Sequence, residues 1–93
     1  MVITNNMNYY RRWNPEKEGS EFFKVWSEES FLNGTRIWSV WTSEGIEGKE
    51  GKVKSEDFRD YDSFQKRMVY LHNTKTVQGY KRRNTEAILS LNV

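Results

Sequence analysis

Short runs rich in aromatic and β-branched residues, bounded by turn residues, recur along the first half of the chain, a pattern that is typical of β-strands. The first such run covers residues 9–13 and ends at Asn14-Pro15, because proline cannot continue a central strand. A second run covers residues 21–26. A third, at residues 35–42, follows Asn33-Gly34, a residue pair that is typical of two-residue hairpin turns. The sequence therefore predicts three consecutive strands, with the last two joined as a hairpin.

The second of these strands is apolar on both faces. Phe22 and Trp26 share one face with Lys24, whereas Phe23 and Val25 lie on the other. We therefore expect this strand in the centre of the sheet.

A loop that contains Gly45, Gly48 and Gly51 follows the third strand. Its glycines indicate either a flexible loop or a backbone that approaches another group closely. Residues 52–58 come next, and their polar pattern predicts a solvent-facing fourth strand.

After residue 60 the period of the apolar residues changes from two to about 3.6, which predicts one helix. The residues of its apolar face recur at spacings of three, four and three: Tyr61, Phe64, Met68 and Leu71. Either Asp60 or Asp62 is suited to cap the first turn, and Gly79 closes the segment after Lys75.

The two ends of the chain lack such a pattern. Residues 1–7 are polar and rich in asparagine, and we interpret them as a loose tail. Residues 84–93 form an extension in which residues 87–91 either add a short strand or fray. Residues 8–83 are predicted to form one α+β domain, an antiparallel sheet of three to five strands with one helix packed on one face.

The composition favours a folded chain over a disordered one. The 93 residues have a mean hydropathy of −0.94 and are 30% charged, but they include four Trp, five Tyr, five Phe and a single Pro. Each buried aromatic side chain removes roughly 150–250 Å² from water, so a few rings suffice for a small core. The length allows one domain.

Several classes of protein are not expected from this composition. The chain has no cysteine and one histidine, which leaves no disulfide and no structural zinc site. His72 has no nucleophile and orienting group beside it, so we interpret it as a surface or half-buried helical residue and expect neither an enzyme nor a cofactor. An acidic cluster lacks the spacing of a calcium loop and is explained by helix capping and solvation: Glu56, Asp57, Asp60 and Asp62.

No apolar run approaches the roughly 18 residues of a membrane span, and the N-terminal residues lack the pattern of a signal peptide. No membrane partner is therefore expected. A cytoplasmic location fits best.

The formal net charge is +2, so a nucleic-acid partner would depend on where the cations lie rather than on their sum. Lys49, Lys52 and Lys54 follow the glycine-containing loop, and the last two share one strand face at a spacing of about 6.6 Å. A solvated edge that discourages strand pairing explains Lys52 and Lys54 equally well. Further basic residues form one patch if the first strand and the segment after the helix are neighbours, although such runs are more often solvated: Arg11, Arg12, Lys81, Arg82 and Arg83.

Tryptophans are the candidates for stacking on bases, which contributes roughly 1–3 kcal/mol per base. Trp26 and Trp38 lie inside alternating strands, which favours core positions. Trp41 precedes the polar pair Thr42-Ser43, so exposure and burial are equally compatible with its position.

The order of the predicted elements resembles that of WGR domains, over residues 8–83. The resemblance places residues 36–41 at the strand that ends in the family's Trp-Gly-Arg signature, and the closing motif, a Lys followed after three residues by Gly-Tyr, fits at Lys75 and Gly79-Tyr80. Thr42 and Ser43 stand where the family has Gly and Arg. In poly(ADP-ribose) polymerases, the signature Trp and Arg lie near the broken end of a DNA duplex and help link domains.

The resemblance implies a small non-catalytic module that binds nucleic acid, with duplex or duplex-end DNA favoured. Trp41 would stack, and Lys49, Lys52 and Lys54 would contact the backbone. The alternative is a protein-interaction module, an adaptor or an inhibitor of a larger enzyme, that no longer binds DNA. Such a module would use exposed aromatic side chains and mixed charges, since Trp, Tyr and Arg dominate protein interfaces. The near-balanced charge and the missing signature Arg favour this alternative over DNA binding.

Overall fold

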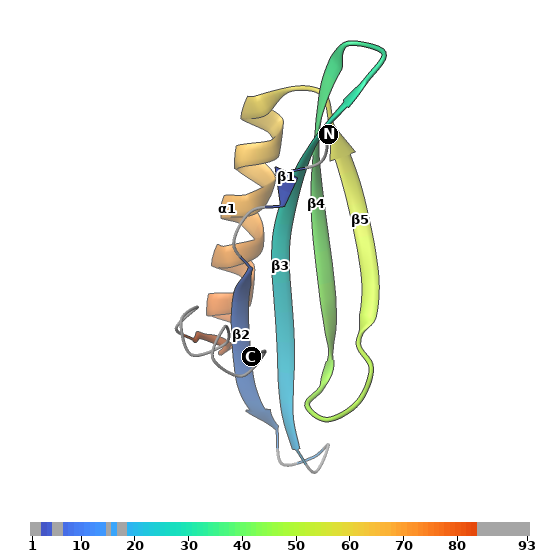
Figure 1. Ribbon diagram of the computed structural model, residues 1–93. Coiled ribbons are helices and arrows are strands. Elements are labelled where there is room, and N and C mark those ends of the chain that lie inside the picture. The colour runs from blue at the N-terminus through green and yellow to red at the C-terminus, as the bar shows by residue number, and fades with distance from the viewer. Residues whose placement is uncertain (1–2, 5–6, 15, 17–18, 84–93) are drawn as a thin grey trace.

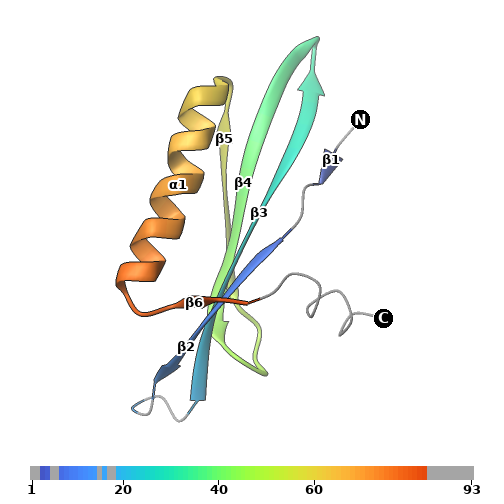
Figure 2. The same cartoon turned by 90° about the vertical axis from the view of Figure 1, so that its left-hand side faces the viewer.

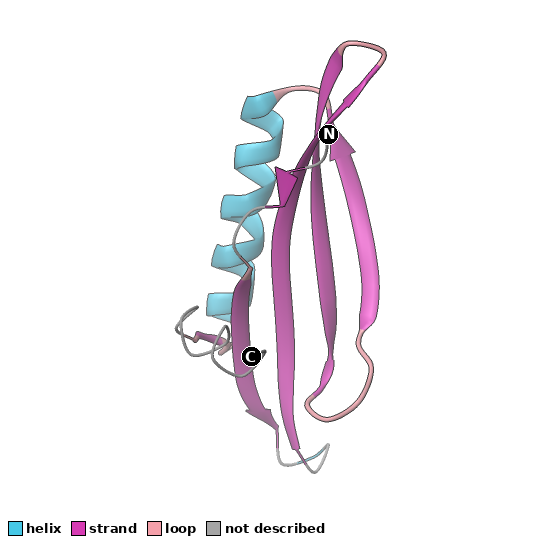
Figure 3. Ribbon diagram, in the orientation of Figure 1, coloured by secondary structure: helices cyan, strands magenta, loops and turns pink. Residues whose placement is uncertain are grey.

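The structure is a computed structural model that describes residues 3–4, 7–14, 16 and 19–83. Its elements are six strands and one helix: β1 (Ile3–Thr4), β2 (Asn8–Asn14), β3 (Gly19–Leu32), β4 (Thr35–Ile46), β5 (Lys52–Phe58), α1 (Tyr61–Val77) and β6 (Lys81–Arg82). Five strands follow one another across an antiparallel sheet in the order β5-β4-β3-β2-β6, and β1 pairs with β3 off this path (Figure 1). The helix lies across one face (Figures 2 and 3). The predicted α+β class is confirmed.

The β3–β4 hairpin is longer than the sequence predicted. Asn33 and Gly34 form its turn with φ angles of 51° and 78°, as an Asn-Gly turn requires. Pairing then continues from Leu32 opposite Thr35 to Glu21 opposite Ile46. Backbone hydrogen bonds carry the strands beyond the apolar run, so side-chain alternation alone underestimated their length.

Ile3–Thr4 is also paired, within the segment of residues 1–7 whose polar sequence predicted a loose tail. Ile3 lies opposite Glu29 and Thr4 opposite Glu28, on the part of β3 that extends beyond β2. This pairing uses backbone groups and leaves no signal in the side-chain pattern. The strand considered for residues 87–91 lies outside the described residues, and β6 forms earlier, in the basic run.

The helix begins and ends as predicted. Asp60 is its N-cap, and the carboxylate accepts hydrogen bonds from the backbone N–H and the hydroxyl of Ser63 at 2.9 and 2.6 Å. Gly79 follows the helix with a φ of 93°, which favours glycine at this position. Phe64 is the one buried residue of α1, and Tyr61, which was expected on the apolar face, is 46% exposed and tilts against Trp38.

The core lies between α1 and the sheet. Its buried members are Tyr10, Phe23, Val25, Val40, Phe64 and Tyr80, and Trp38, Phe58, Met68 and Leu71 pack around them. Trp38, for which a core position was predicted, is half-buried and packs against this core. Trp26 lies on the opposite face of β3, where it is half-buried, so its predicted core position is wrong. The one described helix covers the face of Phe23 and Val25. No described helix covers the face of Phe22 and Trp26, although Phe22 itself is buried, at 5% exposed.

The closing motif ties the end of the helix to the sheet. The N–H of Tyr80 donates to the carbonyl of Lys75 at 3.0 Å, which turns the chain back toward β2. The Lys75 ammonium is 2.8 Å from Glu44 and lies 4.6 and 5.1 Å from the ring centres of Phe23 and Tyr80. The motif therefore joins helix, sheet and core at one point.

Candidate nucleic-acid interface

The helix α1 lies on one side of the sheet, and among the described residues no helix covers the opposite face, called here the open face (Figure 2). The strand register places aromatic side chains of three adjacent strands on this open face. Strand register places Tyr9 opposite Lys24 and Trp26 opposite Trp41, and cross-strand partners point to the same face. Phe22 lies on this face as well, opposite Arg11. We call the four aromatic side chains that pair across these strands the aromatic row: Tyr9, Phe22, Trp26 and Trp41.

The rings of the aromatic row pair across the strands. Tyr9 and Phe22 stack with centroids 6.2 Å apart, and Trp26 and Trp41 stack with centroids 6.1 Å apart. The Lys24 ammonium lies 5.9 and 5.3 Å from the ring centres of Tyr9 and Phe22, which places a cation in the middle of the row.

Trp41 is half-buried, and its indole N–H has no hydrogen-bond partner among the described residues. Trp13 is 67% exposed. It lies on the same face as Tyr9 and Arg11, because every second residue of β2 points to that face. The open face thus combines packed rings with an exposed one.

Basic residues flank the aromatic row along β2 and β6. Arg11 lies opposite Lys81, and the N–H of Arg83 donates to the carbonyl of Tyr9 at 2.8 Å. The first strand and the segment after the helix are therefore neighbours in the sheet, as predicted. We call Arg11, Lys81 and Arg83 the basic edge.

Strand alternation separates the other two arginines of the predicted patch from the basic edge. Arg82 lies opposite Tyr10, and both line a cavity on the α1 side of the sheet that also includes His72. Arg12 has a role within the fold, since it donates to Glu21 at 3.1 Å and to the carbonyl of Gln78 at 2.8 Å. Neither residue faces the aromatic row.

The predicted grouping of Trp41 with Lys52 and Lys54 does not form. Lys54 lies opposite Thr42, one residue beyond Trp41, and Lys52 lies opposite Glu44. Both lysines therefore point to the α1 side, whereas Trp41 points to the open face. Lys49 is exposed in the loop between β4 and β5.

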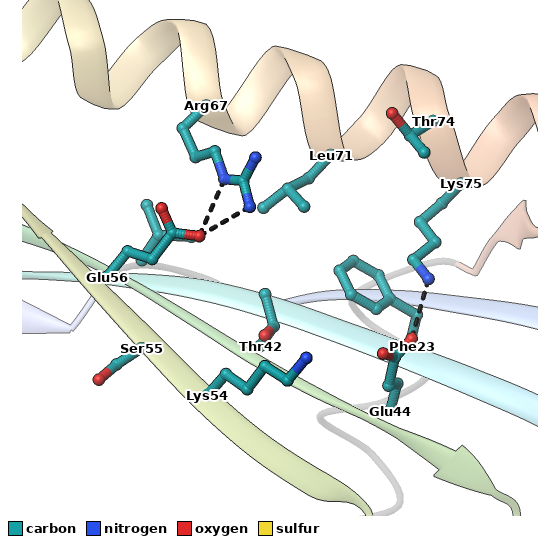
Figure 4. Close-up of a pocket in the computed structure, with 11 residues that line it drawn as sticks. Phe23, Thr42, Glu44, Lys54, Ser55, Glu56, Arg67, Leu71, Thr74 and Lys75 are labelled. Carbon is teal, nitrogen blue, oxygen red and sulfur yellow. Dashed lines mark hydrogen bonds and ion pairs between the residues drawn. The ribbon is translucent and has the colours of Figure 1, made fainter.

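Lys54 lines a groove of about 210 Å³ between α1 and strands β4 and β5 (Figure 4). Two ion pairs cross this groove, Arg67 to Glu56 at 2.7 Å and Lys75 to Glu44 at 2.8 Å. These carboxylates neutralise two of its three cations. The groove therefore offers a phosphate little net positive charge.

Four open-face residues were missed as site residues on the sequence alone: Tyr9, Phe22, Lys24 and Trp26. A signal for three of them was present, because residues 21–26 are apolar on both faces and a single predicted helix covers one. The surface position predicted for His72 on the helix is confirmed. Its Nδ1 and the Tyr10 hydroxyl form a hydrogen bond of 2.8 Å.

Comparison with family models, curated proteins and solved structures found no match to this chain. The resemblance to WGR domains stays a prediction. Within the described residues, no group of three or more His, Cys, Asp or Glu side chains is arranged to hold a metal ion. The single described helix lacks the length and apolar character needed to cross a membrane.

The open face also has an unusual titrating group. The pKa of Tyr9 is raised from 10.0 to about 12, first by burial and then by the hydrogen bond to Glu47 and its negative charge, while Arg11 and Arg83 oppose the shift. Because the folded-state pKa lies above the ordinary one, folding favours the neutral phenol. This contribution to stability is complete below pH 10 and is lost as the pH rises from 10 toward 12.

Replacing Glu47 by glutamine is expected to lower the pKa of Tyr9 toward its ordinary value, because the negative charge next to the phenol is removed. Ultraviolet absorbance of tyrosinate during alkaline titration measures this change, and Tyr9→Phe identifies which step belongs to Tyr9. An unchanged Tyr9 step in Glu47→Gln would show that Glu47 does not act on the phenol.

Proposed function

We propose that this chain is a small non-catalytic module that binds nucleic acid, with DNA favoured, through its open face. The observation that carries the proposal is the aromatic row beside the basic edge. Rings suit the flat faces of bases, and cations suit the phosphates of the same strand. The basic edge, on β2 and β6, adjoins the aromatic row on β2, β3 and β4, so a single strand of nucleic acid would contact both.

This arrangement favours duplex ends and unpaired bases over the interior of a duplex. Base faces are stacked on one another inside a duplex and become accessible to a ring at an end or in a single strand. Lys52 and Lys54, on the α1 side, would take no part in this binding. The expected cations are those of the basic edge together with Lys24.

Fluorescence anisotropy with three DNA probes tests the proposal: a blunt duplex, a single strand, and a duplex of equal length closed by a hairpin at both ends. We expect the two probes with accessible base faces to bind more tightly than the closed duplex. Affinity should fall as salt increases, with a logarithmic slope of about −0.9 for each duplex phosphate neutralised. Equal binding of all three probes would contradict stacking, and absence of binding at low salt would contradict the function.

A second candidate function rests on a different surface. On α1, Val69 and Tyr70 are both 56% exposed and Val77 is 87% exposed, so apolar side chains project from the helix on its solvent side. Such residues suit a protein partner. A protein recovered from nuclease-treated extract by the wild type, and lost with Val69→Asp and Val77→Asp together, would support this candidate over nucleic-acid binding.

A further inference from the structure

The loop between β4 and β5 packs against the open face. The N–H of Glu47 donates to the carbonyl of Ser20 at 2.8 Å, which ties the loop to the start of β3. Gly51 lies so close to Phe22 that a Cβ there would be 2.6 Å from the Phe22 ring and 2.5 Å from the Ser43 hydroxyl. The loop backbone is therefore seated on the aromatic row at Phe22, and a side chain at residue 51 would force Phe22 and Ser43 to shift.

This seating carries the Glu47 carboxylate to the boundary between the aromatic row and the basic edge. One oxygen, Oε1, accepts from the Tyr9 hydroxyl at 2.8 Å and lies 3.0 Å from Nε of Arg11. Arg83 is also close enough to act electrostatically on the Tyr9 hydroxyl. An oxyanion is thus already bound on the open face by a hydroxyl and a guanidinium.

The same donors suit a phosphate. Arginine guanidinium and tyrosine hydroxyl groups are common partners of the phosphate oxygens of nucleic acids, and both bind carboxylates in the same way. The pair between Arg11 and Glu47 is partly solvated, with side-chain exposures of 40% and 31%. Ion pairs of this kind are weak, so a phosphate is able to displace the carboxylate.

We propose that Tyr9, Arg11 and Arg83 form a phosphate subsite and that Glu47 occupies it in the free protein as a built-in competitor. The proposal rests on the proposed function and deepens it. Binding of a strand would exchange the Glu47 carboxylate for a phosphodiester, and Glu47 would then set the affinity below what the basic edge alone would give.

Glu47→Gln tests this subsite, because it removes the competing charge and keeps an oxygen that accepts from Tyr9. We expect the dissociation constant for single-stranded DNA to fall by about 2- to 5-fold at low salt. The logarithmic salt slope should steepen by up to about 0.7, the value for one further phosphate on a single strand. Adding Arg11→Ala to Glu47→Gln should abolish the gain.

Glu50→Gln is the matched control. Glu50 is exposed in the same loop, has no partner among the described residues, and its replacement changes the net charge equally. We expect it to change affinity less than Glu47→Gln and to leave the salt slope unchanged. Thermal unfolding of both variants confirms that each is folded at the temperature of measurement.

The possible results separate the two proposals. If neither the wild type nor Glu47→Gln binds any probe, the proposed function fails and the subsite fails with it. If the wild type binds but Glu47→Gln matches Glu50→Gln, or binds more weakly than the wild type, the subsite alone is overturned. Tighter binding with a steeper salt slope in Glu47→Gln alone supports it.

Discussion

Replacement of Tyr80 by alanine is expected to lower the free energy of unfolding by about 3–5 kcal/mol, the range for truncation of a buried aromatic ring. Tyr80 is 6% exposed and belongs to the core. Its ring lies 4.6 Å beneath the Arg12 guanidinium and 5.1 Å from the Lys75 ammonium. Truncation therefore leaves a cavity and also removes the surface on which two cations are held. Chemical denaturation measures the change.

Tyr80→Phe is the control for this prediction. It keeps the ring and removes a hydroxyl whose contact with Glu21 is long, at 3.4 Å. We expect a loss of no more than about 1 kcal/mol, which is typical of one net hydrogen bond. Equal stability of Tyr80→Ala and the wild type would contradict the role assigned to the closing motif.

Replacement of Trp41 by alanine is expected to weaken DNA binding by about 1–3 kcal/mol, or roughly 5- to 150-fold, because one stacking surface is lost. Its partner ring, Trp26, would also lose the neighbour stacked on it at 6.1 Å. Trp41→Phe retains a ring and should recover part of the affinity. Anisotropy titration with single-stranded DNA measures both.

Tyr70→Ala provides a matched control on the other side of the molecule. Tyr70 is 56% exposed on α1, so its truncation removes an accessible ring from a surface outside the interface. We expect unchanged affinity. If Tyr70→Ala weakened binding as much as Trp41→Ala, stacking on the open face would not explain the binding.

The elements of this fold were largely predictable because they follow from local periodicity. The helix from residue 61, its Asp60 cap and the Asn33-Gly34 turn each depend on residues close in sequence. The lengths of β3 and β4 and the pairing of β1 were not predictable, since backbone hydrogen bonds between distant segments extend the strands irrespective of side chains.

The site was less predictable than the fold, because the face of the sheet on which a side chain lies depends on the register between strands. A shift of one residue decides which face a side chain occupies, and Trp41 and Lys54 fall on opposite faces since Lys54 pairs with Thr42. The position of Glu47 depends on how the loop folds back onto β2 and β3. Gly51 was the available signal, because the expected close approach of the backbone occurs there, against Phe22.

The central claim is that nucleic acid binds on the open face and not on the α1 side. Lys24→Glu and Lys54→Glu test it as a pair, since both reverse one lysine in mid-strand and change the net charge equally. Lys24 lies within the aromatic row, and Lys54 lines the groove beside α1. The measurement is the affinity of each variant for single-stranded DNA at low salt. We predict that Lys24→Glu weakens binding at least about tenfold, equivalent to 1.4 kcal/mol, while Lys54→Glu stays close to the wild type. Stronger weakening in Lys54→Glu than in Lys24→Glu would contradict the account.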